Sequence, residues 1–137
     1  MGILDSVLKK GPTVGKLVKG VYSLDYKFHP FRLNANKNES VMLNLSIKNE
    51  SAKNPLTSVI ISLPEGLGFD NSAIAKSKEF RIGTMSPGET KTFKVEIFGN
   101  YRTSPGNYNL TIECVSNYRD YGYEMEKIKK VVILRAV

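Results

Sequence analysis

Two segments between residues 81 and 115 repeat one pattern, in which a Ser-Pro-Gly turn is followed by apolar residues at every second position. The first turn spans residues 86–89 and the second spans residues 104–107. The apolar residues that follow them are Phe93, Val95 and Ile97 in the first segment, and Tyr108, Leu110, Ile112 and Cys114 in the second. A side-chain period of two places one face of each strand against a core and the other face in water.

The same alternation, or a short continuous apolar run, occurs along most of the chain. It predicts further strands over residues 22–28, 41–47, 56–63, 80–82 and 127–134, separated by turn-forming segments rich in Asn, Ser, Pro and Gly. Many short strands at close spacing are typical of two packed antiparallel sheets. We therefore expect an all-β, immunoglobulin-like antiparallel β-sandwich of seven or eight strands.

The first 19 residues have a different pattern. Ile3, Leu4, Val7 and Leu8 recur at helical spacing, and Gly11-Pro12 ends that stretch. We expect a short, basic and amphipathic helical extension over residues 1–19 and one β-sandwich domain over residues 20–137. A single domain of this length buries a sufficient core without disulfides.

The positive charge of the chain is concentrated near its beginning. The formal net charge is +7, and residues 1–32 contain six Lys and Arg against two Asp. Lys9, Lys10, Lys16 and Lys19 are the candidate binding residues of the extension, opposite an apolar stripe that suits an anionic membrane or a groove on a partner. The alternative is that the extension only covers one open end of the sandwich.

The single cysteine and the lack of a signal-like segment bear on location. One cysteine forms no internal disulfide, which favours a reducing compartment. No apolar run approaches the roughly 20 residues that span a bilayer. We expect a cytoplasmic protein from the chain as it stands, and an extracellular or cell-surface protein if an export signal or anchor has been removed.

Motifs of catalysis and of cofactor binding are missing from the sequence. It has no glycine-rich phosphate loop, no His-Glu-x-x-His and no Cys-x-x-Cys. His29 precedes a proline and is expected at the surface, Cys114 shares the parity of core residues, and Glu124 and Glu126 are followed by lysines, as in a solvated charge ladder. We therefore expect no catalytic residues, no metal and no cofactor.

One loop has the composition of a recognition surface. Residues 117–123 contain Tyr118, Arg119, Tyr121 and Tyr123. Tyrosine provides a large contact area with little loss of rotamer freedom, and arginine anchors polar contacts. Tyr101 and Arg102 extend this surface if the two loops meet at the same end, and the alternative is a hairpin whose tyrosines pack on the sheet edge.

Several motifs together resemble the CARDB and NEW3-like modules, which are immunoglobulin-like domains of archaeal and bacterial proteins. The motifs are Ser46-Ile47-Lys48-Asn49, residues 59–66 with their Pro-Glu-Gly ending, Met85-Ser86-Pro87-Gly88-Glu89, and Gly106-Asn107-Tyr108-Asn109-Leu110. The resemblance covers residues 41–115 and implies adhesion, spacer or scaffold roles. Tyr108 begins a strand, where such sandwiches place a structural tyrosine whose hydroxyl bonds to nearby backbone.

The sequence therefore predicts a non-catalytic interaction or scaffold module that binds another protein through loops or an edge strand. The alternative is a basic domain that binds nucleic acid or an anionic membrane surface, since lysines release counterions from phosphates and aromatic residues stack on bases.

Overall fold

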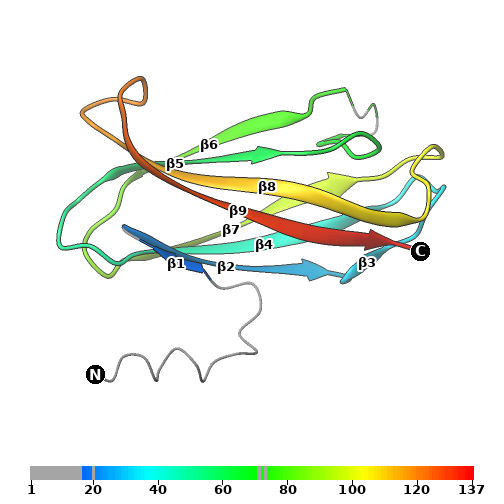
Figure 1. Cartoon of the computed structure of the whole chain (residues 1–137), viewed down its shortest axis with the longest axis horizontal. Coiled ribbons are helices and arrows are strands. Elements are labelled where there is room, and N and C mark those ends of the chain that lie inside the picture. The colour runs from blue at the N-terminus through cyan, green and yellow to red at the C-terminus, as the bar shows by residue number, and fades with distance from the viewer. Residues whose placement is uncertain (1–16, 20, 71, 73) are drawn as a thin grey trace.

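The computed structural model describes residues 17–19, 21–70, 72 and 74–137, which form a sandwich of two β-sheets (Figure 1). The first sheet has the strand order β1-β2-β4-β7, with bounds Leu17–Lys19, Tyr22–His29, Ser40–Asn49 and Thr90–Phe98. The second sheet has the order β3-β9-β8-β5-β6, with bounds Arg32–Leu33, Glu124–Ala136, Gly106–Asn117, Leu56–Ser62 and Ser77–Thr84. The predicted all-β, immunoglobulin-like sandwich is confirmed.

Seven strands contain seven or more residues, and two short strands, β1 and β3, were not predicted. β3 pairs in parallel with β9, whereas all other strand pairs are antiparallel. Runs of two or three residues are too short to show a period, so only their partner strands define them. β9 is also longer than predicted, because residues before the apolar alternation, from Glu124 onward, already pair with β8.

Residues 1–16 of the expected helical extension lie outside the described residues, so the helix stays a prediction. Leu17–Lys19 form β1, which pairs antiparallel with the start of β2. The last three residues of the predicted extension are thus part of the first sheet.

Alternating apolar side chains from both sheets form one core between them. The fully buried members include Leu24, Leu43, Leu45, Ile47 and Ile97 from the first sheet, and Val59, Ile61, Leu110, Ile112 and Leu134 from the second. Burying each such side chain contributes about 1.5–3 kcal/mol. The period-two pattern of the sequence therefore defines the interior as well as the strands.

Tyr22 connects the two sheets through a buried hydroxyl. Its oxygen lies 2.8 Å from Oγ1 of Thr57 and donates to the carbonyl oxygen of Val115 at 3.3 Å. Burial raises the pKa of Tyr22 to about 12. The phenol therefore stays neutral, as a buried polar group with partners should.

The loops gather at two ends of the sandwich, which the path of β8 defines (Figure 1). The loops of residues 50–55, 85–89 and 118–123 lie at the end where β8 finishes, because Leu56 pairs with Asn117 and Thr84 pairs with Leu56. We call this the tyrosine end. The loops of residues 34–39, 63–70 and 99–105 lie where β8 begins, since Thr103 accepts from the N–H of Asn36 and its hydroxyl donates to the carbonyl oxygen of Gly66. We call this the opposite end.

Candidate functional site

The loop between β8 and β9 is closed by its own hydrogen bonds. The backbone N–H of Tyr118 donates to the carbonyl oxygen of Tyr123 at 2.7 Å, and the N–H of Gly122 donates to Oδ1 of Asp120 at 2.9 Å. Arg119 has φ 68°, in the left-handed region that Gly, Asn and Asp occupy most readily. An arginine in this conformation adds backbone strain of about 1–2 kcal/mol, which the loop contacts must offset.

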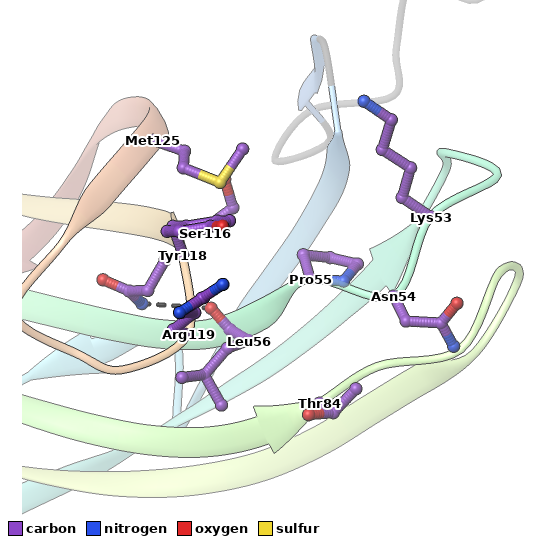
Figure 2. Close-up of a pocket in the computed structure, with 10 residues that line it drawn as sticks. Lys53, Asn54, Pro55, Leu56, Thr84, Ser116, Tyr118, Arg119 and Met125 are labelled. Atoms are coloured by element: carbon purple, nitrogen blue, oxygen red, sulfur yellow. Dashed lines mark hydrogen bonds between the residues drawn. The ribbon is translucent and has the colours of Figure 1, made fainter.

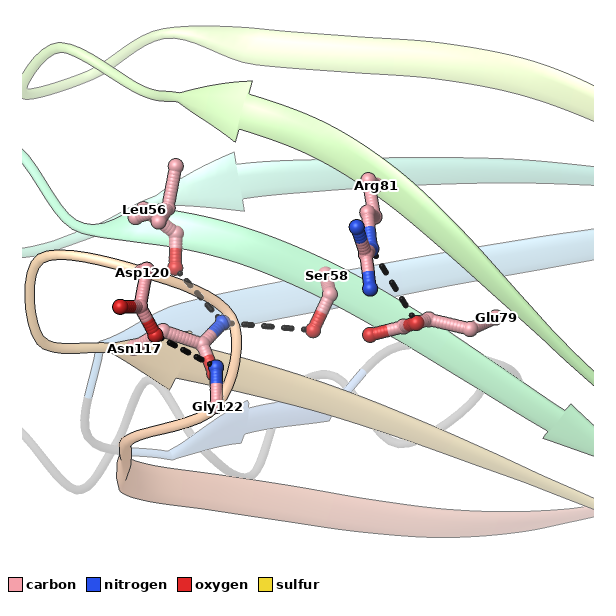
Figure 3. A network of polar contacts seen from close by, with 7 residues as sticks. All are labelled: Leu56, Ser58, Glu79, Arg81, Asn117, Asp120 and Gly122. Atoms are coloured by element: carbon pink, nitrogen blue, oxygen red, sulfur yellow. Dashed lines mark hydrogen bonds and ion pairs between the residues drawn. The ribbon is translucent and has the colours of Figure 1, made fainter.

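Asn117 attaches the base of this loop to the sheet (Figure 3). The residue is buried, and its Nδ2 donates to the carbonyl oxygen of Leu56 at 3.0 Å and to Oγ of Ser58 at 3.3 Å. Both acceptors belong to β5. The base of the loop is therefore fixed to the neighbouring strand.

Tyr121 packs on the outer face of the second sheet. The guanidinium carbon of Arg81 lies 4.7 Å from the centre of its ring, and the register places Arg81, Ser58 and Val115 in one row across the sheet. Val115 and Ser58 are buried although they lie on the outer face. The alternative that the tyrosines pack on the sheet is thus confirmed for Tyr121.

Tyr118 and Tyr123 remain exposed, at 53% and 62% of their surface. Arg119 lies over the ring of Tyr118, with 5.1 Å between the guanidinium carbon and the ring centre. Met125 is 57% exposed at the start of β9. We call Tyr118, Arg119, Tyr123 and Met125 the tyrosine surface.

A shallow depression of about 300 Å³ adjoins this surface (Figure 2). Tyr118, Arg119 and Met125 line one side of it, and Figure 2 shows Lys53, Asn54, Pro55, Leu56 and Thr84 around the rest. The residues of the 50–55 loop were not expected here. Their sequence has only the polar, Pro-containing composition of a loop, and the β5–β8 pairing is what brings them beside Tyr118.

The structure does not bring Tyr101 and Arg102 to the tyrosine surface. They lie in the 99–105 loop at the opposite end, and the twelve residues of β8 separate the two loops. Lys9, Lys10 and Lys16 lie outside the described residues, and Lys19 ends β1 opposite Tyr22. Of the expected binding residues, the structure thus gathers Tyr118, Arg119 and Tyr123, and buries part of Tyr121 against Arg81.

The opposite end is held by buried hydrogen bonds around Thr103. Oγ1 of Thr103 donates to the carbonyl oxygen of Gly66 at 2.7 Å and accepts from the N–H of Asn100 at 2.8 Å. The hydroxyl of Tyr108 donates to the carbonyl oxygen of Ser104 at 2.6 Å. The predicted structural role of Tyr108 is confirmed, because this is the backbone contact of a tyrosine corner.

The remaining reactive groups have structural surroundings. Cys114 is buried as predicted, and desolvation raises the pKa of its thiol to about 12, so that it stays protonated. Nζ of Lys127 pairs with Oε1 of Glu124 at 3.5 Å, and His29 is exposed. Within the described part of the chain, no three potential metal-ligating side chains lie together.

The described residues contain no helix that is long and apolar enough to cross a bilayer.

No family model matches the chain, and a search of curated proteins finds no match, so the resemblance to CARDB and NEW3-like modules stays a prediction. Among solved structures, the chain is similar to a conjugative transposon lipoprotein from Bacteroides eggerthii, with 11% identity and a TM-score of 0.45 over 85% of this chain and 98% of that one. It is also similar to BslA, a bacterial hydrophobin, with 12% identity and a TM-score of 0.47 over 88% and 98% of the two chains. The third similarity is to the ASH/PapD-like domain 7 of human CEP192, with 14% identity and a TM-score of 0.46 over 90% and 95%. Similarities at this level carry no information about function.

Proposed function

We propose that this chain is a non-catalytic, immunoglobulin-like interaction module that binds another protein, with the tyrosine surface as its principal contact. The supporting observation is that Tyr118, Arg119 and Tyr123 stay exposed on a loop that Asn117 and Tyr121 fix to the sheet. A fixed aromatic and guanidinium surface loses little entropy on binding. The scaffold role that the CARDB and NEW3-like resemblance implies belongs to the same proposal.

The left-handed conformation of Arg119 supports the same assignment. Residues in strained backbone regions often lie at ligand-binding positions, where the side chain matters more than the local stability. Glycine at this position relieves the strain but removes the guanidinium group. An arginine at this position is therefore consistent with a binding role.

A capture experiment in extracts of the source cells tests the proposal. We expect the double variant Tyr118→Ser/Tyr123→Ser to lose a specific captured protein by more than about tenfold, as the loss of hot-spot aromatics does. Tyr101→Ser is the matched control, because Tyr101 is 71% exposed at the opposite end. Circular dichroism and thermal unfolding of each variant confirm that the fold is intact.

Equal loss in the Tyr101→Ser control, or retention of the captured protein by the double variant, contradicts the proposal. A variant with Lys9, Lys10 and Lys16 changed to Gln separates the extension from the loops. A loss confined to that variant assigns binding to the extension.

The alternative, binding to nucleic acid or to an anionic membrane, is supported by the cations of β9. Lys127, Lys129, Lys130 and Arg135 lie along this strand, and of these only Lys127 has a carboxylate partner among the described residues. Gel-shift and vesicle-flotation assays over a range of salt concentrations test it. A steep fall in affinity with salt supports phosphate binding, and no binding at low salt excludes it.

A further inference from the structure

β9 is paired along its whole length on one side and along two residues on the other. β8 pairs with it from Glu124 to Ala136, whereas β3 pairs only with Arg135 and Ala136. Among the described residues, no strand pairs with this second edge between Met125 and Leu134. In Figure 1, β9 (red) runs beside β8, and β3 lies near its C-terminal end. The outward-turned backbone groups of this edge are therefore available to another strand.

The side chains of this edge strand are unusually apolar for an exposed surface. Val131 and Ile133 lie on its outer face and are 52% and 55% exposed. The complete edge strands β6 and β7 expose serine, threonine and charged side chains on their outer faces. An added strand beside β9 would cover Val131 and Ile133, a gain that the outer faces of β6 and β7 do not offer.

The charges on the same face follow a fixed order. Lys127 and Lys129 precede Val131 and Ile133, all at every second position and therefore on one face. Lys130 points the other way, with its Nζ 5.9 Å from the centre of the Tyr26 ring on β2. From Lys127 onward, the outer face of this edge is therefore basic and then aliphatic, although Lys127 also pairs with Glu124 at 3.5 Å.

Charge decides which strand fits this edge. A second copy of β9 would bring Lys127 and Lys129 of both strands, four lysines in all, to the outer face of one seam, and like charges across a sheet repel. Residues 1–16 of this chain contain Lys9, Lys10 and Lys16 against Asp5 alone. Both candidates from the chain itself are therefore basic, whereas an acidic segment of another protein complements the edge.

We propose that the free edge of β9 accepts an extended acidic–apolar segment of a partner protein as an added antiparallel strand. The segment has apolar residues opposite Ile133 and Val131, followed by acidic residues opposite Lys129 and Lys127. Read from its N-terminus, the order is apolar, any, apolar, any, acidic, any, acidic, over about 23 Å of strand. Because Met125 belongs to both regions, this edge is continuous with the tyrosine surface, and the inference rests on and deepens the proposed function.

Fluorescence anisotropy with short synthetic peptides of this pattern tests the main-chain ladder without altering the protein. One peptide has N-methyl groups on one set of alternate residues, and a second peptide has them on the other set. Alternate N–H groups of a strand point to opposite edges. We expect the peptide whose methyl groups face β9 to lose more than about tenfold in affinity, because several inter-strand hydrogen bonds are missing. The other methylated peptide should bind within about twofold of the parent.

A charge-reversal pair on the protein tests the side-chain order. We expect Lys129→Glu to weaken the parent peptide about fivefold, because one cross-strand pair changes from attraction to repulsion. A peptide with Lys at the opposing position should restore the affinity to Lys129→Glu. Lys94→Glu is the control, since Lys94 is exposed on the edge strand β7 and makes the same change in net charge.

Several results overturn the inference. Equal binding of the two methylated peptides, or equal effects of Lys129→Glu and Lys94→Glu, is one such result. Displacement of the peptide by an oligonucleotide or by anionic vesicles is another. Self-association in the ultracentrifuge that prevents peptide binding is a third. Capture that depends on Tyr118 and Tyr123 but without peptide binding overturns this inference alone. Peptide binding without such capture overturns only the role of the tyrosine surface.

Discussion

The loops before and after β8 contain the same dipeptide, Tyr-Arg, in two different surroundings. At the opposite end, Tyr101 and Arg102 belong to a loop in which the backbone N–H of Arg102 donates to Oδ1 of Asn100 at 2.7 Å and Thr103 is fully buried. At the tyrosine end, Arg119 adopts a left-handed conformation and stacks on Tyr118. The first loop is built around a buried residue, and the second is built around exposed ones.

The two Ser-Pro-Gly turns also differ between the ends, in the group that stabilises them. The turn of residues 104–107 is held by the Tyr108 hydroxyl, a neutral contact to a backbone oxygen. The turn of residues 86–89 is held by Oε1 of Glu89, which accepts from the N–H of Ser86 at 2.8 Å. Equal turn sequences therefore do not imply equal roles, because the residues that surround a turn decide what stabilises it.

The largest effect on stability is expected at Thr103. Thr103→Val leaves the Gly66 carbonyl and the Asn100 N–H without their partner, which should lower the free energy of unfolding by about 2–3 kcal/mol. Thermal unfolding should show a decrease in Tm of roughly 10 °C. Thr92→Val is the control, because Thr92 is exposed and should change Tm by less than about 2 °C. Equal decreases would show that the opposite end is not specially stabilised.

A smaller effect of opposite sign is expected at Arg119. Arg119→Gly removes the free-energy cost of the left-handed conformation, which is larger than the free-energy cost of the added flexibility of glycine in the unfolded chain. The free energy of unfolding should therefore rise by about 0.5 kcal/mol. Arg102→Gly relieves no positive φ and should lower stability by about 0.5–1 kcal/mol. Denaturant unfolding measures both variants. If Arg119→Gly lowers stability as Arg102→Gly does, Arg119 contributes to the fold, and the trade between stability and binding does not exist.

The smallest effect is the pH dependence of the Glu89 turn. The backbone contact with Ser86, and then Lys91, hold the pKa of Glu89 below its usual value, so its contribution is present above the unfolded-state pKa and is lost as pH falls through the folded-state pKa. The Tm difference between the natural protein and Glu89→Gln should therefore begin to shrink as pH falls through the usual glutamate pKa of about 4.3 and disappear once pH lies below the lowered folded-state pKa of Glu89. Tyr108→Phe at the other turn should lower Tm by an amount that is constant over this range. A constant difference for Glu89→Gln as well would show that its charge makes no contribution.

The alternation of apolar residues was sufficient to predict most of the fold. Val41, Leu43, Leu45 and Ile47 are all buried, and Cys114 follows the core parity of Leu110 and Ile112. The pattern is local, because neighbouring side chains on a strand necessarily point to opposite faces. Tyr108 was predictable for a similar reason, since a Gly-x-Tyr at a strand start needs only the adjacent turn to form its contact.

The site was predictable only in part. The sequence identified Tyr118, Arg119, Tyr121 and Tyr123 by composition, with packing of the tyrosines on the sheet edge as an alternative. It did not indicate which tyrosine would pack there or that Arg81 on β6, about forty residues earlier, would be its partner. The free edge of β9 was also invisible, because it depends on the two-residue pairing of β3. Such contacts join residues that are distant in the chain, and no local period records them.

The sequence by itself determined which side chains alternate toward the core and where the two Ser-Pro-Gly turns lie, since both follow from interactions within a few residues. The number and spacing of such strands then indicated a sandwich. The tertiary structure decided which loops share an end, which of the tyrosines stay exposed and which open edge carries exposed apolar side chains. These depend on strand order and register, and those are set by the packing of both sheets against each other.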